Sequence, residues 1–302
     1  MKKSTLLLLL AFNIIWGGTY AATKSLMQHA PYFLVTATRF FIAAVPLLLY
    51  VARRYGLRMD RRDALRCALI GVATFTLSPA LMYAGVARGR AADAAILTAT
   101  EPLLISVGAY LYLRERLAPR TLAALAVAFG GAALLSEFWR AQGGARPLSV
   151  ALIALAVCCE AVYSVLGKEV LRRHPPLKAI AASLAFGSAV NLIVVFAAGW
   201  PRRLAGFTGR DWLVLVGYLS LLCTIIGYSV WNLSLQANAA ASVAITIFVQ
   251  PVGGLFLSWW WVNETPAIGQ LLGAATILAA VAVATLGRSP NPAAAPPTGP
   301  TV

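Results

Sequence analysis

The chain has 302 residues, of which 60% are hydrophobic and only 12% are charged, with a formal net charge of +15. Its mean hydropathy is +0.77. Soluble globular domains carry about 25% charged residues, so the composition excludes that class. A bilayer core about 30 Å thick needs about 20 apolar residues per helical span, and such runs follow one another along almost the whole sequence. The sequence therefore predicts an integral membrane protein.

Ten apolar segments are predicted to cross the membrane as helices, because a bilayer offers no water to unpaired backbone groups. Runs such as LAALAVAFGGAALL lack the alternation of a membrane β-strand, which favours an all-α integral membrane protein. The expected spans are 5–24, 31–52, 63–84, 91–112, 119–138, 149–171, 177–198, 211–232, 239–261 and 266–286. The proline-rich residues 288–302 are expected to form a disordered C-terminal tail.

The N-terminal segment MKKSTLLLLLAF resembles a secretory signal, because basic residues precede an apolar run. No small-residue cleavage site follows it cleanly, and a polar face continues to Lys24. We interpret this segment as the first span, with a signal peptide as the alternative.

The basic residues are distributed unevenly between the expected loops. With a cytoplasmic N-terminus, 14 Lys and Arg residues fall on the cytoplasmic side and 7 on the opposite side. This bias predicts that both termini of the multi-pass chain are cytoplasmic, in a bacterial inner (plasma) membrane. The charge thus reflects topology and does not indicate binding of nucleic acid.

The sequence contains an internal repeat. At an offset of 149, Ala91–Ile96 matches Ala240–Ile245, Glu101-Pro102 matches Gln250-Pro251, and Glu115 matches Glu264; at an offset of 144, Lys24 matches Lys168 and Pro31 matches Pro175. The order and spacing predict a five-helix repeat in residues 1–138 and a second in residues 139–287. An odd number of spans makes the two repeats inverted relative to each other, which favours alternating access.

Several stretches resemble a known family. IIWGGTYAATKSL, Pro31, Arg39-Phe40, the Glu-Pro pair at 101–102 and RERLAPRTLAALAVAFGGAALL at 114–135 are similar to the EamA branch of the drug/metabolite transporter (DMT) superfamily, and within it to YddG-type exporters of aromatic amino acids and paraquat. The resemblance implies ten transmembrane helices in two inverted repeats around a central cavity. The second half departs from the pattern, with Glu160 where Trp16 sits and Gln250 where Glu101 sits.

Polar and aromatic residues form stripes along several expected spans. In the first span, Asn13, Trp16, Gly17, Tyr20 and Lys24 share one helical face. Hydrogen bonding between packed helices would explain any one stripe, whereas stripes in spans 1, 3, 6, 8 and 9 together favour a shared cavity with largely apolar, aromatic walls. The predicted substrate-binding residues are Asn13, Trp16, Tyr20, Phe75, Ser78, Thr98, Glu101, Glu160, Tyr163, Tyr228, Trp231, Thr246 and Gln250.

Two glutamates are expected near the middle of their spans. A charged side chain at that depth costs at least about 2.5–3.5 kcal/mol, so Glu101 and Glu160 mark a functional cavity unless they are protonated structural groups. Glu101 has a further structural interpretation, because it can satisfy backbone groups that Pro102 leaves free. Arg39 in the second span is a candidate counter-ion, or it snorkels to the interface.

Span ends and glycines give further expectations. Prolines at matching sites 102 and 251 indicate helix breaks near a binding region. Glu115 and Glu264 are expected to stabilise the N-termini of the fifth and tenth helices. Gly269 and Gly273 form a small-residue face for close packing of the tenth helix, within the chain or across a dimer.

Catalytic motifs are missing from the sequence. It contains neither HExxH nor GxSxG, and its two histidines lie at expected span ends, so we predict no enzyme, no metal and no cofactor. The expected function is export or facilitated movement of small organic solutes, with amino acids including aromatic ones, related metabolites or aromatic cations as substrates. A non-transporting receptor or scaffold, or a carrier of another metabolite such as a nucleobase, remains the alternative. Monomer and homodimer both remain open.

Overall fold

The structure is a computed structural model that describes residues 3–88, 97–137, 147–199, 206–262 and 266–286, without the side chains of 20, 21, 24 and 257–262. Within these ranges the chain is helical and contains no strand. Seven of the described helices are long and apolar enough to cross a membrane, and three shorter apolar helices accompany them. The all-α membrane class is therefore confirmed, and the tail at 288–302 lies outside the described residues.

The first half contains α1 (Lys3–Gly17), α2 (Thr19–Leu26), α3 (Tyr32–Arg54), α4 (Arg61–Val72), a π-helical turn (Ala73–Leu77), α5 (Ser78–Val86), α7 (Glu101–Leu111) and α8 (Pro119–Ser136). The second half contains α9 (Pro147–Leu171), α10 (Pro176–Ala197), α11 (Gly209–Trp212), a π-helical segment (Leu213–Gly227), α12 (Tyr228–Ala237), α13 (Ala240–Ala244), a 3-10 turn (Ile245–Phe248), α14 (Val249–Val262) and α15 (Ile268–Leu286). Proline opens α8 and α10, where its fixed φ suits a first helical turn.

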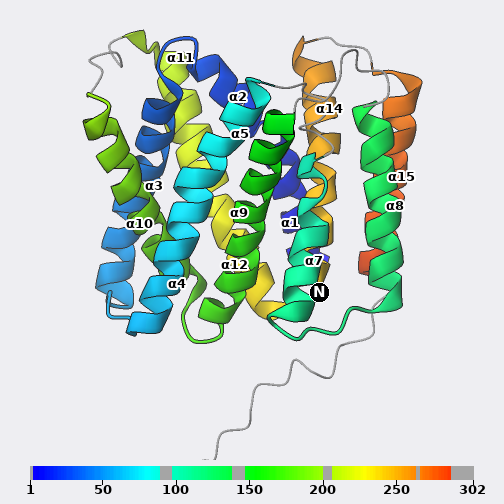
Figure 1. Ribbon diagram of the computed structural model, residues 1–302, viewed down its shortest axis with the longest axis horizontal. Helices are drawn as coiled ribbons and strands as arrows, with labels where there is room; N and C mark the ends of the chain where they lie inside the picture. Colours follow the sequence, from blue (N-terminus) through cyan, green and yellow to red (C-terminus); the bar gives the residue numbers. More distant parts are fainter. Residues whose placement is uncertain (1–2, 89–96, 138–146, 200–205, 263–265, 287–302) are drawn as a thin grey trace, which may run out of the picture.

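Equivalent helices of the two halves run in opposite directions. In Figure 1, α3 descends from the upper face, whereas α10, its counterpart, climbs from the lower face, where the N-terminus also lies. The helix pairs that pack together show the same symmetry. The α7 helix packs on α9, and the equivalent pair is α14 on α1. The α4 helix packs on α10, and the equivalent pair is residues 213–227 on α3. The two halves therefore pack against each other through equivalent pairs of helices.

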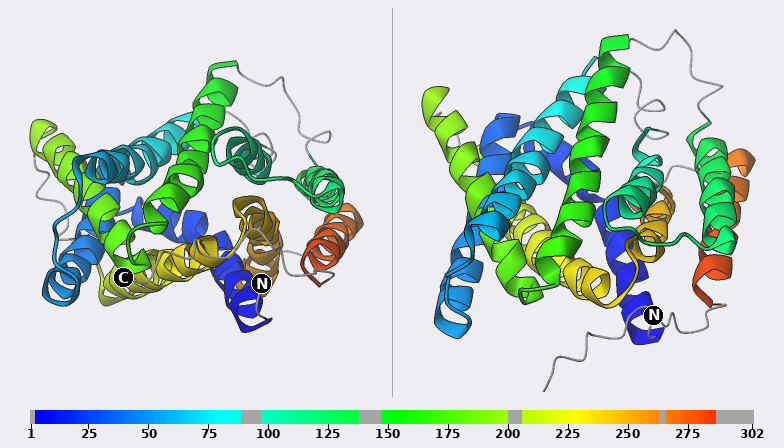
Figure 2. Two further views of the ribbon diagram at one scale, coloured as in Figure 1. Left: turned by 90° about the horizontal axis from the view of Figure 1, so that it is seen from below. Right: turned by 60° about the horizontal axis from the view of Figure 1, so that its bottom comes forward.

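The α8 and α15 helices lie side by side at one edge of the molecule, opposite the pair α3 and α10 (Figure 2). A Cβ atom at Gly273 would lie 2.5 Å from the backbone nitrogen of Leu135 and 2.6 Å from the carbonyl oxygen of Gly131. Only a glycine permits this approach. The Gly273 face predicted from the sequence thus packs within the chain.

Three of the expected continuous spans are broken. Gly18 separates α1 from α2 in the first span. In the fourth, a turn at Ala99 and Thr100 precedes α7, so Glu101 lies in the first turn of a helix and not in its middle. The ninth span has a matching break, where a 3-10 turn precedes α14 and Gln250 occupies its first turn. Proline fits the first turn of a helix and removes a hydrogen bond from a helix interior, so Pro102 and Pro251 favour helix starts at the breaks in the fourth and ninth spans.

Candidate functional site

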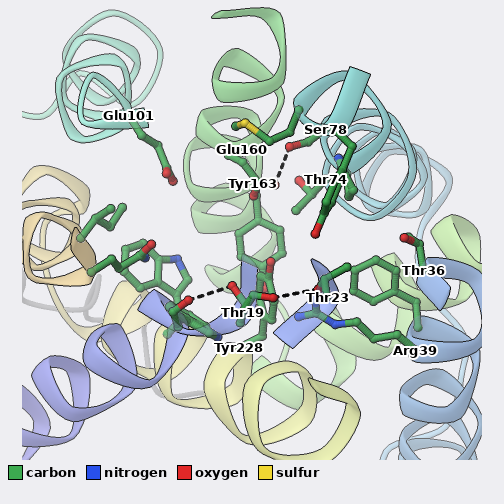
Figure 3. A pocket seen from close by; sticks show the side chains of 18 of the residues that line it. Thr19, Thr23, Thr36, Arg39, Thr74, Ser78, Glu101, Glu160, Tyr163 and Tyr228 are labelled. Atoms are coloured by element: carbon green, nitrogen blue, oxygen red, sulfur yellow. Dashed lines mark hydrogen bonds between the residues drawn. The ribbon is translucent and has the colours of Figure 1, made fainter. Parts of the chain in front are cut away.

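A central pocket lies between the two halves and is lined by residues of both (Figure 3). Eight of the thirteen predicted site residues line it: Trp16, Ser78, Glu101, Glu160, Tyr163, Tyr228, Trp231 and Gln250. They come from α1, α5, α7, α9, α12 and α14. These helices thus bring together residues that are far apart in the sequence.

Aromatic side chains form one wall of this pocket. The Trp16 ring centroid lies 5.4 Å from that of Tyr228 and 6.0 Å from that of Trp231. Tyr163 lies 5.0 Å from Tyr228, edge to face. Hydrogen bonds fix two of these rings, because Trp16 Nε1 donates to the Cys223 carbonyl at 2.9 Å and Tyr163 Oη donates to Asn232 Oδ1 at 2.9 Å. Their polar atoms are thereby satisfied, and their apolar faces can contact a ligand.

Phe75 lies behind this wall, contrary to the expectation that it faces a substrate. It is fully buried and is not among the residues that line the pocket. Its ring packs against Tyr163 and Tyr228, with centroids 6.0 and 5.2 Å away. The π-helical turn at 73–77 leaves Thr74 and Ser78 on the pocket side and turns Phe75 into the core.

Asn13 and Thr246 also have positions that the sequence did not reveal. Both are buried and lie outside the lining, where Asn13 Nδ2 donates to Thr246 Oγ1 at 3.1 Å. Gln250, which does line the pocket, donates from Nε2 to Asn13 Oδ1 at 3.0 Å. This network holds α1 to the broken ninth helix and positions Gln250. Thr98 does not line the pocket, and the side chain of Tyr20 lies outside the described residues.

Charged groups of both signs reach the pocket. Glu160 accepts a hydrogen bond from Ser78 Oγ at 2.7 Å, and Glu101 projects from the first turn of α7 (Figure 3). The positive end of that helix favours a carboxylate there. Arg39 donates from Nε to Thr224 Oγ1 at 3.2 Å, and its guanidinium carbon lies 4.9 Å from the centre of the Phe40 ring.

Of a further polar wall on α2 and α3, sequence reasoning identified only Arg39. Tyr32, Thr36 and Arg39 of α3 line the pocket, and so do Thr19 and Thr23 of α2. The first three are spaced i, i+4 and i+7, which is one helical face, so the signal was present in the second span. The apolar residues around these positions obscured this polar face.

Glu115 does not line the pocket but forms polar contacts between the two halves. Glu115 accepts a hydrogen bond from the Ala240 N–H at 2.8 Å and forms an ion pair with Lys168 at 2.8 Å. Glu115 therefore stabilises the start of α13, not the N-terminus of α8 that directly follows it in the sequence. Its predicted counterpart, Glu264, lies outside the described residues.

One further cluster has the composition of a metal site. Ligand atoms of Asp60, Asp63 and His174 lie within 4.8 Å of one another. However, Arg66 and Arg173 lie 2.7 and 3.8 Å from the carboxylate of Asp63. These guanidinium groups already neutralise the carboxylate, and their charge opposes a bound cation.

Fold and pocket define the class: a multi-pass membrane protein with a solute-sized site between two inverted halves. The chain belongs to the EamA-like transporter family, whose family model matches it twice, over residues 3–137 and 147–286. The family resemblance drawn from the sequence is thus confirmed, and the YddG-type resemblance stays a prediction.

Relatives cover nearly the whole chain. A probable terminal-alkyne amino-acid exporter of Streptantibioticus cattleyicolor is 26% identical over 95% of this chain and 97% of its own length. A probable amino-acid metabolite efflux pump of Salmonella typhimurium is 24% identical over 95% and 96%. An S-adenosylmethionine/S-adenosylhomocysteine transporter of Chlamydia trachomatis is 24% identical over 85% and 81%. These names indicate transport and not catalysis.

A solved crystal structure has the same fold. Its TM-score to this chain is 0.77, with 21% sequence identity, and the match covers 95% of this chain and 98% of the other.

Proposed function

We propose that this protein transports amino acids, including aromatic ones, and related metabolites or aromatic cations across the bacterial inner membrane by alternating access. The observation that carries the proposal is the pocket between the halves, where Trp16, Tyr163, Tyr228 and Trp231 offer ring faces beside polar and charged groups. Such a mixture suits a small solute with a flat apolar side chain and a polar end.

The basic-residue bias supports cytoplasmic termini, which puts the lower face of Figure 1 in the cytoplasm. The pocket includes residues of α2 and the first turns of α3, which lie toward the upper face in that view. The structure is then the outward-facing state. Two relatives named for amino-acid or amino-acid-metabolite export favour net movement outward.

Transport of a larger solute is the second candidate. One relative is named as a transporter of S-adenosylmethionine and S-adenosylhomocysteine, which combine an amino-acid end with an adenine ring. The aromatic wall would stack on such a ring as readily as on an aromatic side chain.

Counterflow into liposomes tests the proposal. Purified protein is reconstituted with unlabelled solute inside, and uptake of labelled phenylalanine, leucine, adenine, S-adenosylmethionine or an aromatic dication is measured. We expect saturable uptake of phenylalanine above empty liposomes. Uptake of the adenine compounds alone would favour the second candidate, and no flux of any probe would favour a receptor or scaffold.

A further inference from the structure

Arg39 is a cation in the pocket without an acidic partner. Among the described residues, no carboxylate lies within ion-pair distance of its guanidinium, and its hydrogen bond runs from Nε to the neutral hydroxyl of Thr224. A guanidinium has five N–H donors in a planar fork that fits a carboxylate. The fork of Arg39 therefore retains donors for a ligand.

The carboxyl groups of Glu101 and Glu160 lie on another side of the same pocket. Figure 3 shows Glu101 and Glu160 apart from Arg39, with Tyr163 and Tyr228 between them. Neither carboxyl has an ion-pair partner in the part of the chain that the structure describes, and Glu160 is bound by the hydroxyl of Ser78. The pocket thus has a positive and a negative end.

Positive and negative side chains at membrane depth are costly unless a partner of opposite charge neutralises each of them. A cation alone would leave Arg39 uncompensated, and an anion alone would face two carboxyl groups. A dipolar solute compensates both ends at once, and the aromatic wall lies between them for its side chain.

We propose that Arg39 is the residue that binds the substrate carboxylate, while Glu101 and Glu160 face its ammonium group, so the pocket selects zwitterions over simple cations and anions. This inference rests on the proposed function. It predicts that the pocket prefers amino acids to aromatic cations, whereas the proposed function includes both as substrates.

Three probes that share a phenyl ring test this selection: phenylalanine carries both charges, phenethylamine only the ammonium and 3-phenylpropionate only the carboxylate. Binding to purified wild type, Arg39→Lys and Arg39→Gln is measured by equilibrium dialysis, and flux by counterflow. The wild type is expected to bind phenylalanine at least about tenfold more tightly than either other probe, since a charge-assisted hydrogen bond contributes about 1.5–3 kcal/mol.

Arg39→Gln should lower phenylalanine affinity to that of phenethylamine and leave phenethylamine binding unchanged or stronger, with Arg39→Lys intermediate because its ammonium lacks the planar fork. Equal weakening of both probes, or equal wild-type affinity for both, would overturn the inference. So would absence of phenylalanine binding to the wild type. Selective binding without flux would instead contradict the proposed function and leave the inference standing.

A second inference comes from the contacts below the pocket and does not depend on the substrate. Glu115, in the segment that follows α7, contacts Lys168 of α9 and the Ala240 N–H that opens α13, and Lys168 also donates to the Asn238 carbonyl. The side chains of Lys168 and Glu115 are only 13% and 15% exposed.

These contacts join α9 and α13 of the second repeat to the segment that follows α7 in the first repeat. Val170, Leu235 and Val243 of the neighbouring helices are fully buried, in the same hydrophobic cluster as the pocket residues Tyr163 and Trp231. In the sequence, each of the three positions also has a counterpart in the other repeat. We infer that the Glu115–Lys168–Ala240 contact is the clasp that closes the pocket on the side of the N-terminus.

The test uses a cysteine-free protein with Ser164→Cys, a residue that lines the pocket. Inside-out vesicles are treated with an impermeant maleimide, which reaches the protein from the N-terminal side. Glu115→Ala and Lys168→Met should each raise the labelling rate several-fold, because either change breaks the ion pair. Glu169→Ala is the matched control, since Glu169 pairs only locally, with Arg172 three residues later. Unchanged labelling in both clasp variants, or an equal rise in the control, would overturn the inference.

Discussion

Side chains around the pocket divide into those that face it and those that hold the facing residues in place. Trp16 faces the pocket, and the Cys223 carbonyl fixes its orientation; Gln250 faces it and is held by Asn13. Both kinds of residue lie on the same polar stripes in the sequence. A stripe therefore identifies the helices of the site, but not which of its members contact a solute.

The aromatic wall leads to a selective prediction. Trp16→Ala and Trp231→Ala should each reduce uptake of phenylalanine several-fold more than uptake of alanine, because an aromatic pair contributes about 0.5–1.5 kcal/mol beyond area burial. Counterflow at matched protein levels measures this ratio, with Trp212→Ala, outside the pocket, as the control. Equal losses for both solutes would assign the two rings a structural role.

Glu160 leads to a prediction about coupling. If protons drive transport, a carboxyl must gain and lose a proton in each cycle, and glutamine cannot do so. Glu160→Gln should then abolish uphill uptake driven by a pH gradient while counterflow, which needs no gradient, continues. Glu169→Gln on the same helix should retain both activities. A wild type whose flux ignores an imposed pH gradient is a facilitator, and Glu160 then only lines the pocket.

At the scale of the helices, irregularities coincide with the site. Residues 73–77 form a π-helical turn, α7 begins at Glu101, and a 3-10 turn precedes Gln250. Each irregularity changes the face that the following side chains present, and each lies next to a residue that lines the pocket. Broken helices are tolerated at membrane depth where they border a cavity. The regular α8 and α15, in contrast, pack tightly at the edge.

The packing of α8 on α15 can be tested with two glycines, one on the packed face and one away from it. A Cβ at Gly273 would meet backbone atoms of α8, whereas a Cβ at Gly130 has no such neighbour within 4 Å. Gly273→Ala should therefore lower stability by about 1–3 kcal/mol, as overpacking does. Gly130→Ala should be neutral or stabilising, since alanine favours helix by up to about 1 kcal/mol. Thermal unfolding in detergent, followed by size exclusion, compares the two; a similar melting temperature for both would contradict the close packing.

At the scale of the molecule, the inverted relation of the halves links topology to transport. Each half packs its helices against the other, and both halves contribute residues to the pocket. A pocket between inverted halves can open to either side by exchange of their conformations.

Orientation in the membrane gives the last prediction. In a cysteine-free background, cysteines at Arg58 and Arg288 should react with an impermeant reagent only from the cytoplasm, whereas one at Arg210 should react from outside. The expectation follows from the excess of basic residues on the first side, 14 against 7. Labelling of Arg58→Cys in intact cells would contradict this orientation and indicate the opposite one.

The sequence by itself determined the membrane class, the repeat and most helices of the site, because these depend on hydropathy, charge bias and helical spacing, which are local properties. Only the tertiary structure decided that Phe75 faces the core, that Thr246 binds Asn13, and that Arg39 joins Glu101 and Glu160 in one pocket. Those facts depend on where helices break and on which segments from opposite halves meet. Such contacts are set by packing between residues far apart in the sequence, for which the sequence has no periodic signal.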